Sequence, residues 1–219
     1  MVPASVRLYR PEDRDRIRRI CYLTGYMGEP VDWYWRDERS FADMWSSYYT
    51  DAEPESLFVV ERGGAVAGYL FGCLDSRRAW NPAWIGARQA VTRLCLARLG
   101  TAGVIWRTVA DVAIGRLVGR PPVETPFFDQ RWPSHLHINL LPEARGSGAG
   151  RALVDAWFDR LRTAGSPGCH LETLAENIRA IGFFEAVGFT RFGEPQAVPG
   201  ERSRDGMRLH RQVMVRSIA

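Results

Sequence analysis

Residues 145–151, with the sequence RGSGAGR, have the composition of a loop that binds an anion through its backbone. They follow an apolar, strand-like segment and precede a segment with apolar residues at helical spacing. At such a junction the first N–H groups of the helix lack backbone partners and the helix dipole presents its positive end, while glycine leaves out the Cβ that would keep a ligand away. The segment therefore predicts a pyrophosphate site. A plain glycine loop that caps a helix is the alternative, because it would have the same composition.

Spacing separates this segment from two other phosphate loops. A dinucleotide fingerprint has the spacing GxGxxG, but Gly150 is followed by Arg151, so the third glycine falls one place early. A P-loop needs a lysine, and all 29 basic residues are Arg. The remaining pattern is R-x-x-G-x-G, from Arg145 through Gly148 to Gly150. The lack of lysine also excludes a Schiff base or a lysine nucleophile.

Glu172 is a candidate site residue. It stands in HLETLAEN, residues 170–177, where the two-residue period of a strand places Glu172 and His170 on one face and Leu171 and Thr173 on the other. A carboxylate beside an anion site can accept a proton from a substrate, and partial burial would raise its pKa. A structural carboxylate that holds backbone or an arginine is the alternative.

Four other polar residues are candidates for a site. His135 and His137 alternate with apolar residues and share a face of their strand, either as hydrogen-bonded sheet residues or as a catalytic pair. Asp75 ends a strand, where it can bind a cationic amine or simply be solvated. Asn177 has the position of a helix N-cap.

The elements that position these residues follow from hydrophobic periodicity and turn residues. We expect, in chain order, a strand at 6–10, helices from Pro11 and at 40–49, a hairpin at 56–75, a mostly helical stretch at 80–132, a strand at 135–141, a helix to about 164, a strand at 168–173, a helix at 177–188, an exposed loop at 193–206 and a last strand at 206–217. The helical stretch contains an apolar stripe of Val104, Ile105, Val109, Val112, Ala113 and Leu117.

Composition limits the number of domains and the classes of partner that we expect. The chain has 219 residues, 46% hydrophobic and 25% charged, which favours a single domain over residues 1–219. It contains no run of about 18 apolar residues, and its start is charged, so we expect a soluble, cytoplasmic protein without membrane partners. Arginines alternate with acids, which argues against nucleic-acid binding despite the net charge of +4. The four cysteines are scattered, which predicts free thiols and no metal site.

Two longer stretches carry a family resemblance. With HINLLPEARGSGAGRAL and LETLAENIRAIGFFEAVGF, the chain resembles the GNAT superfamily of acetyl-CoA-dependent N-acetyltransferases over roughly residues 135–192. The resemblance implies an α/β (α+β) fold with a central mixed, mostly antiparallel twisted sheet flanked by helices, and a helical insertion at about 80–132 between strands 3 and 4. It also implies transfer of acetyl from acetyl-CoA to an amine, whose identity as a small molecule or a protein stays open.

A narrower resemblance covers most of the chain. YRPEDRDRIRRICYLTG, FVVERGGAVAGYLFGCLD and FDQRWPSHLHI are similar to the acetyltransferase-like C-terminal domain of O-GlcNAcase enzymes and its free-standing bacterial relatives. The glycine turn, degraded in the animal versions, is complete here.

The superfamily resemblance implies residue roles. The pyrophosphate would be held by main-chain N–H groups of the turn, which comprises Arg145, Gly146, Ser147, Gly148, Ala149, Gly150, Arg151 and Ala152. The pantetheine arm would pair with Asn139, Leu140 and Leu141 and bond to Asn177, and the strand is expected to splay from its neighbour because Pro142 and the turn stop the ladder. Glu172 would be the base and the N–H of Leu140 the donor to the acetyl oxygen.

One position departs from the family pattern. Members often carry a Tyr as general acid where this chain has Phe184. Either another group such as Tyr48, Tyr49 or Tyr69 donates the proton, or none is needed because a thiolate is already a tolerable leaving group. The departure also supports an alternative function, a non-catalytic acyl-CoA-binding or protein-interaction module. The oligomeric state stays open between a monomer and a homodimer.

Overall fold

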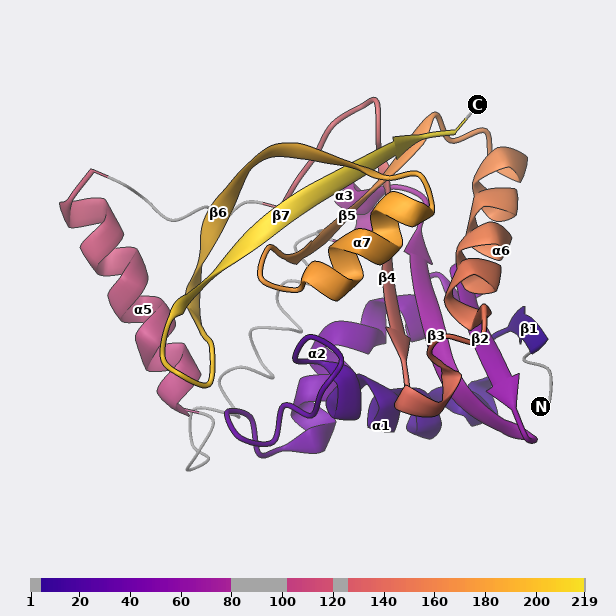
Figure 1. Cartoon of the computed structure of the whole chain (residues 1–219), viewed down its shortest axis with the longest axis horizontal. Coiled ribbons are helices and arrows are strands. Elements are labelled where there is room, and N and C mark those ends of the chain that lie inside the picture. Colours follow the sequence, from indigo (N-terminus) through magenta and orange to yellow (C-terminus); the bar gives the residue numbers. More distant parts are fainter. Residues whose placement is uncertain (1–4, 80–101, 120–125, 219) are drawn as a thin grey trace.

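The computed structural model of the chain describes residues 5–79, 102–119 and 126–218. Figure 1 shows its elements, which in chain order are β1 (Ser5–Leu8), α1 (Arg14–Thr24), α2 (Glu38–Asp51), β2 (Leu57–Arg62), β3 (Ala65–Cys73), α3 (Ser76–Ala79), α5 (Ala102–Leu117), β4 (Ser134–Leu140), α6 (Ala149–Thr163), β5 (Gly168–Leu174), α7 (Ile178–Ala186), β6 (Thr190–Arg202) and β7 (Arg208–Ser217).

Seven strands form one sheet in the order β1-β2-β3-β4-β5-β7-β6. Only the central pair, β4 and β5, is parallel, and the other neighbours are antiparallel. The expected mixed, mostly antiparallel sheet is therefore confirmed. The expected insertion is also present, because helices α3 and α5 lie between β3 and β4 in the chain.

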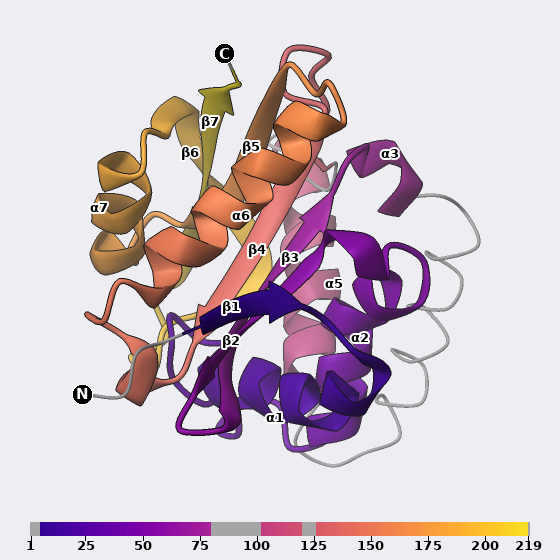
Figure 2. The same cartoon turned by 90° about the vertical axis from the view of Figure 1, so that its right-hand side faces the viewer.

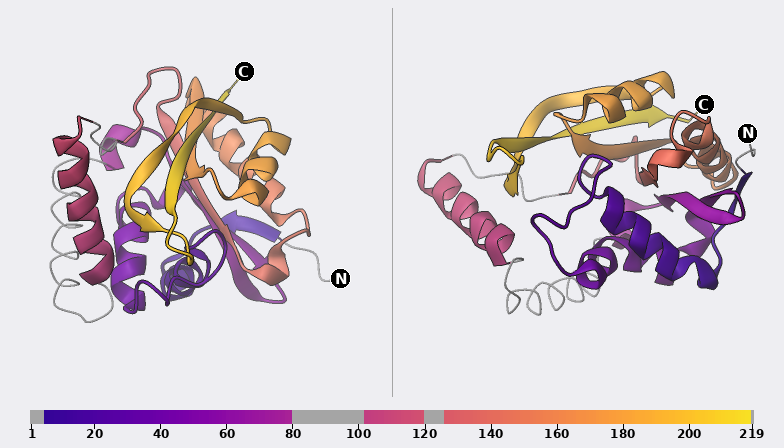
Figure 3. Two further views of the ribbon diagram at one scale, coloured as in Figure 1. Left: turned by 60° about the vertical axis from the view of Figure 1, so that its left-hand side comes forward. Right: turned by 60° about the horizontal axis from the view of Figure 1, so that its bottom comes forward.

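Helices cover both faces of the sheet (Figures 2 and 3). On one face α6 and α7 pack on the strands, with Trp157 and Leu153 buried against Leu136. On the other face α1 and α2 enclose a second buried cluster that includes Tyr69 and Phe71 of β3. The alternation of side chains along each strand separates these two clusters, since successive residues point to opposite faces.

The sheet opens between β4 and β5. These strands pair only at Ser134 with Cys169 and at His135 with His170, although both continue for several residues. The remaining length of β4 stays paired with β3, and that of β5 with β7, so each strand follows its outer neighbour and the two diverge (Figure 1). The expected splay is confirmed, and it begins well before Pro142.

The expected loop at 193–206 is wrong. Most of it belongs to β6, which pairs with β7 through two register shifts. Because β6 is an edge strand, Pro195 and Pro199 cost no ladder hydrogen bond on the open side. The glycines and prolines that indicated a loop instead mark an irregular edge strand.

Helix α5 confirms part of the helical insertion but not its apolar stripe. Its polar residue Asp111 holds it to β6, accepting from the N–H of Gly200 at 2.8 Å and from Arg202 at 2.7 Å. Three residues of the stripe are exposed: Val109 at 53%, Leu117 at 86%, and Ala113. They are exposed because the side of α5 that faces the sheet includes Asp111 and not the whole apolar stripe. Residues 126–132 are irregular rather than helical, and 80–101 and 120–125 lie outside the described residues.

The described helices include none long and apolar enough to cross a membrane. Cys21, Cys73 and Cys169 are buried free thiols, as expected, while Cys95 lies outside the described residues.

Candidate functional site

The glycine turn leaves the start of α6 uncapped. Gly148 is the N-cap residue, with φ 84° in the left-handed region that glycine adopts without strain, and no side chain caps this end. The Ser147 hydroxyl turns away and donates to the carbonyl oxygen of Ala144 at 2.7 Å. The first backbone bond of the helix runs from the N–H of Ala152 to Gly148 at 3.0 Å. The N–H groups before it are therefore available to an anion, as the sequence predicted.

The glycines of the turn serve different purposes. A Cβ on Gly146 or Gly148 would meet no atom within 4 Å, so both face open space. A Cβ on Gly150 would lie 3.1 Å from the Phe183 ring and 3.3 Å from the Leu140 side chain. Gly150 therefore allows α6 to pack closely on α7 and β4, which the sequence interpretation did not separate from ligand approach.

Hydrogen bonding to β3 decides which backbone groups of β4 face the opening. The N–H of Leu141 donates to Ala67 at 2.9 Å, so the alternation of a strand turns the N–H groups of Leu140 and Ile138 to the β5 side. Beyond His135 that side is the opening between the strands. The Leu140 N–H therefore faces this opening.

Two predicted backbone roles do not fit this geometry. Both backbone groups of Leu141 bond within the chain, its N–H to Ala67 and its carbonyl to the N–H of Ala144 at 3.0 Å. The backbone of Asn139 faces β3, and its side-chain amide donates to the Thr24 hydroxyl at 2.7 Å. The backbone of Ile138, rather than that of Asn139 or Leu141, faces the opening beside Leu140. The two-residue period of a strand, applied to β4 as it was to β5, would have predicted this.

Glu172 projects from β5 on the same face as His170, while Leu171 is buried on the other, as predicted. Its carboxylate accepts from Arg211 at 3.1 Å and from the backbone N–H of Phe127 at 3.2 Å. The side chain is 33% exposed. These contacts are those of the structural alternative, a carboxylate that holds both an arginine and backbone.

The two histidines of β4 differ. His135 is fully engaged, with the Tyr49 hydroxyl at 2.7 Å from Nε2 and the Ser76 hydroxyl at 2.7 Å from Nδ1. His137 makes no hydrogen bond within the described residues and stacks on Phe71 with ring centroids 6.5 Å apart. Surrounding protein desolvates the ring and lowers the pKa of His137 to about 4, yet the residue keeps an exposed surface.

None of the expected proton donors has a free hydroxyl at the opening. Phe184 is buried in the core under α7. The Tyr48 hydroxyl donates to Glu53 at 2.9 Å, and that of Tyr49 contacts His135. The Tyr69 hydroxyl is buried, and no described residue lies within hydrogen-bond geometry of it; desolvation raises the pKa of Tyr69.

Two further candidates act as helix caps. Asn177 accepts from the N–H of Ala180 at 3.2 Å, which confirms its N-cap position at α7. Asp75 accepts from the N–H of Arg77 at 3.0 Å, near the start of β4, where the sheet is still closed. The geometry therefore gives Asp75 no contact with the opening.

Two arginines tie the α1–α2 loop to the opening. Arg145 donates through Nε to the carbonyl oxygen of Leu140 at 3.0 Å and through Nη2 to that of Gly28. Arg179 of α7 donates to the carbonyl oxygen of Met27 at 3.0 Å. Desolvation and then the charge of Arg179 lower the pKa of Arg145. No sequence signal joins residues so far apart.

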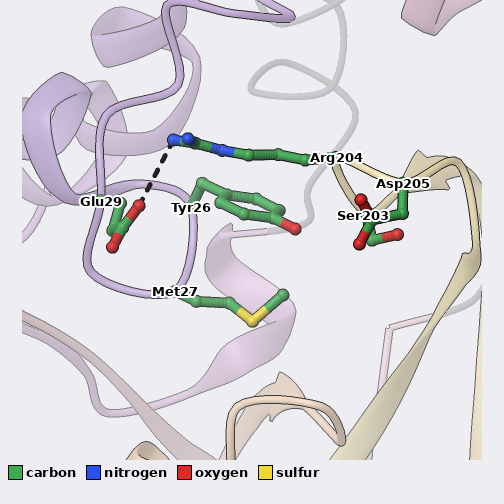
Figure 4. A pocket seen from close by; sticks show the side chains of 6 residues that line it. All are labelled: Tyr26, Met27, Glu29, Ser203, Arg204 and Asp205. Atoms are coloured by element: carbon green, nitrogen blue, oxygen red, sulfur yellow. Dashed lines mark hydrogen bonds and ion pairs between the residues drawn. The ribbon is translucent and has the colours of Figure 1, made fainter.

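An open pocket of about 330 Å³ lies where the α1–α2 loop meets the turn between β6 and β7 (Figure 4). It is lined by Tyr26, Met27, Glu29, Ser203, Arg204 and Asp205. The guanidinium of Arg204 spans it and pairs with Glu29 at 3.3 Å. The loop and the hairpin thus meet through a salt bridge.

The model of the acetyltransferase (GNAT) family matches residues 26–189. Mouse N-acetyltransferase family 8 member 5 is 30% identical over 96 residues, 44% of this chain and 42% of that protein, so less than half of that relative is spanned. Human N-acetyltransferase 8B is 22% identical over 213 residues, 89% of this chain and 87% of that one.

Solved structures show the same fold. The crystal structure of SsHAT superposes with a TM-score of 0.69 at 24% identity and covers 99% of both chains. A Salmonella typhimurium acetyltransferase, solved with its cofactor acetyl-CoA, superposes with a TM-score of 0.59 at 15% identity and covers 99% of this chain and 94% of that one.

Proposed function

The chain belongs to the GNAT acetyltransferase family, and from this premise we propose that it transfers the acetyl group of acetyl-CoA to an amine that attacks the thioester directly. The observation that carries the proposal is the coincidence of two features. The sheet opens between β4 and β5, and the uncapped start of α6 lies at the end of β4. A long ligand with an anionic part fits this pair of features.

The residues present fit coenzyme A at its phosphate end. Gly146 and Gly148 face open space, and the N–H groups of Ser147, Ala149 and Gly150 stand at the positive end of α6. The remaining members of the turn assigned to this role are Arg145, Arg151 and Ala152, although Arg151 already donates to Ala186 at 2.9 Å. When bound, acetyl-CoA supplies an activated acyl carbon.

The arm of the coenzyme would lie along β4. We assign the free N–H of Leu140 as the donor to the acetyl oxygen, which is the position where negative charge develops during attack. Ile138 replaces Leu141 among the backbone groups that pair with the arm. Asn177, whose side chain already caps α7, remains a candidate contact.

Glu172 would accept the proton of the attacking amine, directly or through a water molecule. Its carboxylate is oriented by Arg211 and by the backbone N–H of Phe127, so it can accept the proton only when one of these two contacts gives way. No phenolic acid is assigned, because Phe184 is buried and the tyrosines are engaged elsewhere or buried.

A non-catalytic acyl-CoA-binding module is the second candidate. The observation in its favour is Phe184, which fills the core at the place where many family members carry a tyrosine. The occupied carboxylate of Glu172 points the same way.

Thiol release separates the two candidates. Purified protein with acetyl-CoA and a panel of amines should release free thiol faster than the blank without an amine, and Glu172→Gln should lower the rate. Thermal stabilisation by acetyl-CoA, with no thiol released by any amine of the panel, would instead support the binding module. The control is Glu194→Gln, which changes an exposed glutamate of β6 that has no hydrogen bond or ion pair within the described part of the chain.

Finer assignments rest on the sequence alone. The narrower resemblance to the acetyltransferase-like domain of O-GlcNAcase enzymes and its bacterial relatives is a proposal, and so is the cytoplasmic location, which rests on the composition of the chain. The acceptor amine and a homodimeric state also stay open.

A further inference from the structure

The outer side of α5 is mostly apolar, whereas a surface helix ordinarily turns charged residues to solvent. Asp111, the acidic residue of the helix, points inward and holds α5 to Gly200 and Arg202 of β6. On the outer side Trp106 is 66% exposed and Leu117 is 86% exposed. A continuous apolar face that is left in water indicates that another molecule covers it.

A row of exposed residues runs along this outer side, and we call it the α5 row. It consists of Gly103, Trp106, Ala110, Ala113 and Leu117. The intervals of three, four, three and four positions keep the row in line along the helix, which is the spacing at which one helix packs along another in a coiled coil. A Cβ on Gly103 would meet no atom within 4 Å, so the row begins in open space.

The α5 row is symmetric in the sizes of its residues. Ala110 and Ala113 lie in the middle, and the large residues Trp106 and Leu117 each lie four positions beyond the nearer alanine. In a second copy of α5 that runs antiparallel, the partner's Leu117 therefore lies against Trp106, and the partner's Ala113 lies against Ala110. Such a contact is two-fold symmetric and closes on itself, because each pair occurs twice.

The small residues in the middle of the α5 row favour a helix as the occupant. Two alanines let a neighbouring helix approach closely, and the large residue at each end fills the space beside them. A helix that lies in a membrane surface instead presents bulky apolar residues along its whole buried face. The centre of the α5 row offers a lipid surface little to bury.

The charges beside the α5 row permit the antiparallel arrangement. Arg107 and Ile114 are seven positions apart and lie on one side of the row, and Val109 and Arg116 likewise share the other side. Two-fold packing brings each side against its own copy, so Arg107 meets the partner's Ile114 and Arg116 meets the partner's Val109. An arginine stem can cover an apolar side chain while its charge stays in water.

We propose that the outer side of α5 is a self-association surface, on which the α5 row of a second copy of this chain packs antiparallel. The helix stands at one end of the molecule beside the edge strand β6 (Figures 1 and 3). In the sheet order β7 and β6 separate this end from the opening between β4 and β5, so the inference is independent of the proposed function.

Sedimentation velocity of the full chain tests the association. A contact between two helices of 16 residues lies at the low end of the roughly 1,200–2,000 Å² that specific interfaces bury, so we expect weak association. Between about 1 µM and 1 mM the mass should rise from that of one chain to that of two. A chain that stays monomeric over this range would overturn the inference.

Leu117→Glu should raise the dissociation constant by at least about 10-fold, because a two-fold contact buries the new carboxylate twice. The side chain is exposed in a single copy, so the far-UV circular dichroism of the variant should not change. The matched control is Ile178→Glu, which alters an isoleucine of α7 that is 68% exposed. Equal effects of Leu117→Glu and Ile178→Glu on the dissociation constant would overturn the inference.

Disulfide cross-linking tests the antiparallel direction. A mixture of Trp106→Cys and Leu117→Cys proteins should form a cross-linked dimer of the two variants on mild oxidation. Neither variant alone should cross-link more than the unaltered chain, because identical positions lie about 16 Å apart along an antiparallel pair. Cross-linking within each variant alone, as parallel helices would give, would overturn the proposed arrangement.

Vesicles test a lipid surface as the occupant. The unaltered chain and Leu117→Glu are sedimented with phosphatidylcholine vesicles that do or do not contain phosphatidylglycerol. We expect no difference between the two proteins. A monomeric chain that binds the vesicles, with binding abolished by Leu117→Glu but not by Ile178→Glu, would overturn self-association and assign the α5 row to a lipid surface.

Discussion

The guanidinium of Arg211 on β7 donates to the carboxylate of Glu172 on the neighbouring strand β5 at 3.1 Å. The second carboxylate oxygen accepts from the backbone N–H of Phe127 at 3.2 Å. Glu172 is thus oriented from two sides at the opening between β4 and β5. A base in this arrangement gains a fixed position, but it must exchange one contact for the amine.

Glu172→Gln should lower kcat by about 10²- to 10⁴-fold, the usual contribution of a positioned acid or base. Arg211→Gln should lower kcat by less, because the carboxylate remains and only its orientation is lost. Steady-state thiol release measures both. Equal, small effects of the two variants would indicate that the pair is structural, and the melting temperature of each variant in the absence of ligand shows how much of any loss is due to unfolding.

Sequence patterns predicted those parts of the candidate site that depend on interactions between residues close together in the chain. The glycine turn, the strand of Glu172 and the cap at Asn177 each depend on neighbours within a few residues, so periodicity and capping preferences indicate them. The strand β6 was missed because Pro195 and Pro199 are typical of loops and only the sheet edge makes them tolerable.

Long-range contacts had no such signal. The bond from Arg145 to Gly28 joins residues 117 positions apart, and a lone arginine in a glycine turn has many possible partners. The ion pair between Asp111 and Arg202 likewise joins residues 91 positions apart.

Arg145→Gln should loosen the α1–α2 loop without any ligand present. Arg145 donates to carbonyl oxygens of Leu140 and Gly28, and hydrogen bonds from a charged group contribute about 1.5–3 kcal/mol each at most. We expect faster amide exchange in residues 26–31 and a loss of about 2 kcal/mol in the free energy of unfolding. The control is Arg151→Gln, whose exposed side chain makes one bond, to Ala186. Unchanged exchange in the loop would show that Arg145 does not restrain it.

His137 should titrate far below an ordinary histidine. Desolvation lowers its pKa from 6.5 to about 4, so an NMR titration of its ring protons should have a midpoint near that value, assigned by the loss of the signal in His137→Gln. The unfolded chain binds the proton more readily than the folded protein between these values. This residue's contribution to stability is therefore complete above pH 6.5 and is lost as the pH falls toward 4, and His137→Gln should make that decline shallower. A midpoint near 6.5 would mean that water solvates the His137 ring fully.

Gly148→Glu tests where the diphosphate binds. A carboxylate at the N-cap would accept from the free N–H groups of α6 and repel phosphate, so stabilisation by acetyl-CoA should disappear. For the unaltered protein that stabilisation is about 2.7 kcal/mol at a ligand concentration 100 times Kd.

The matched control for this variant is Gly165→Glu, because Gly165 follows the other end of α6, has φ 67° and also faces open space. Both substitutions place a glutamate in the left-handed region, so both should lower the melting temperature of the free protein to a similar degree. Only Gly148→Glu should abolish the shift with acetyl-CoA. If both variants keep the shift, the start of α6 does not hold the diphosphate, and the free N–H groups there serve another anion or none.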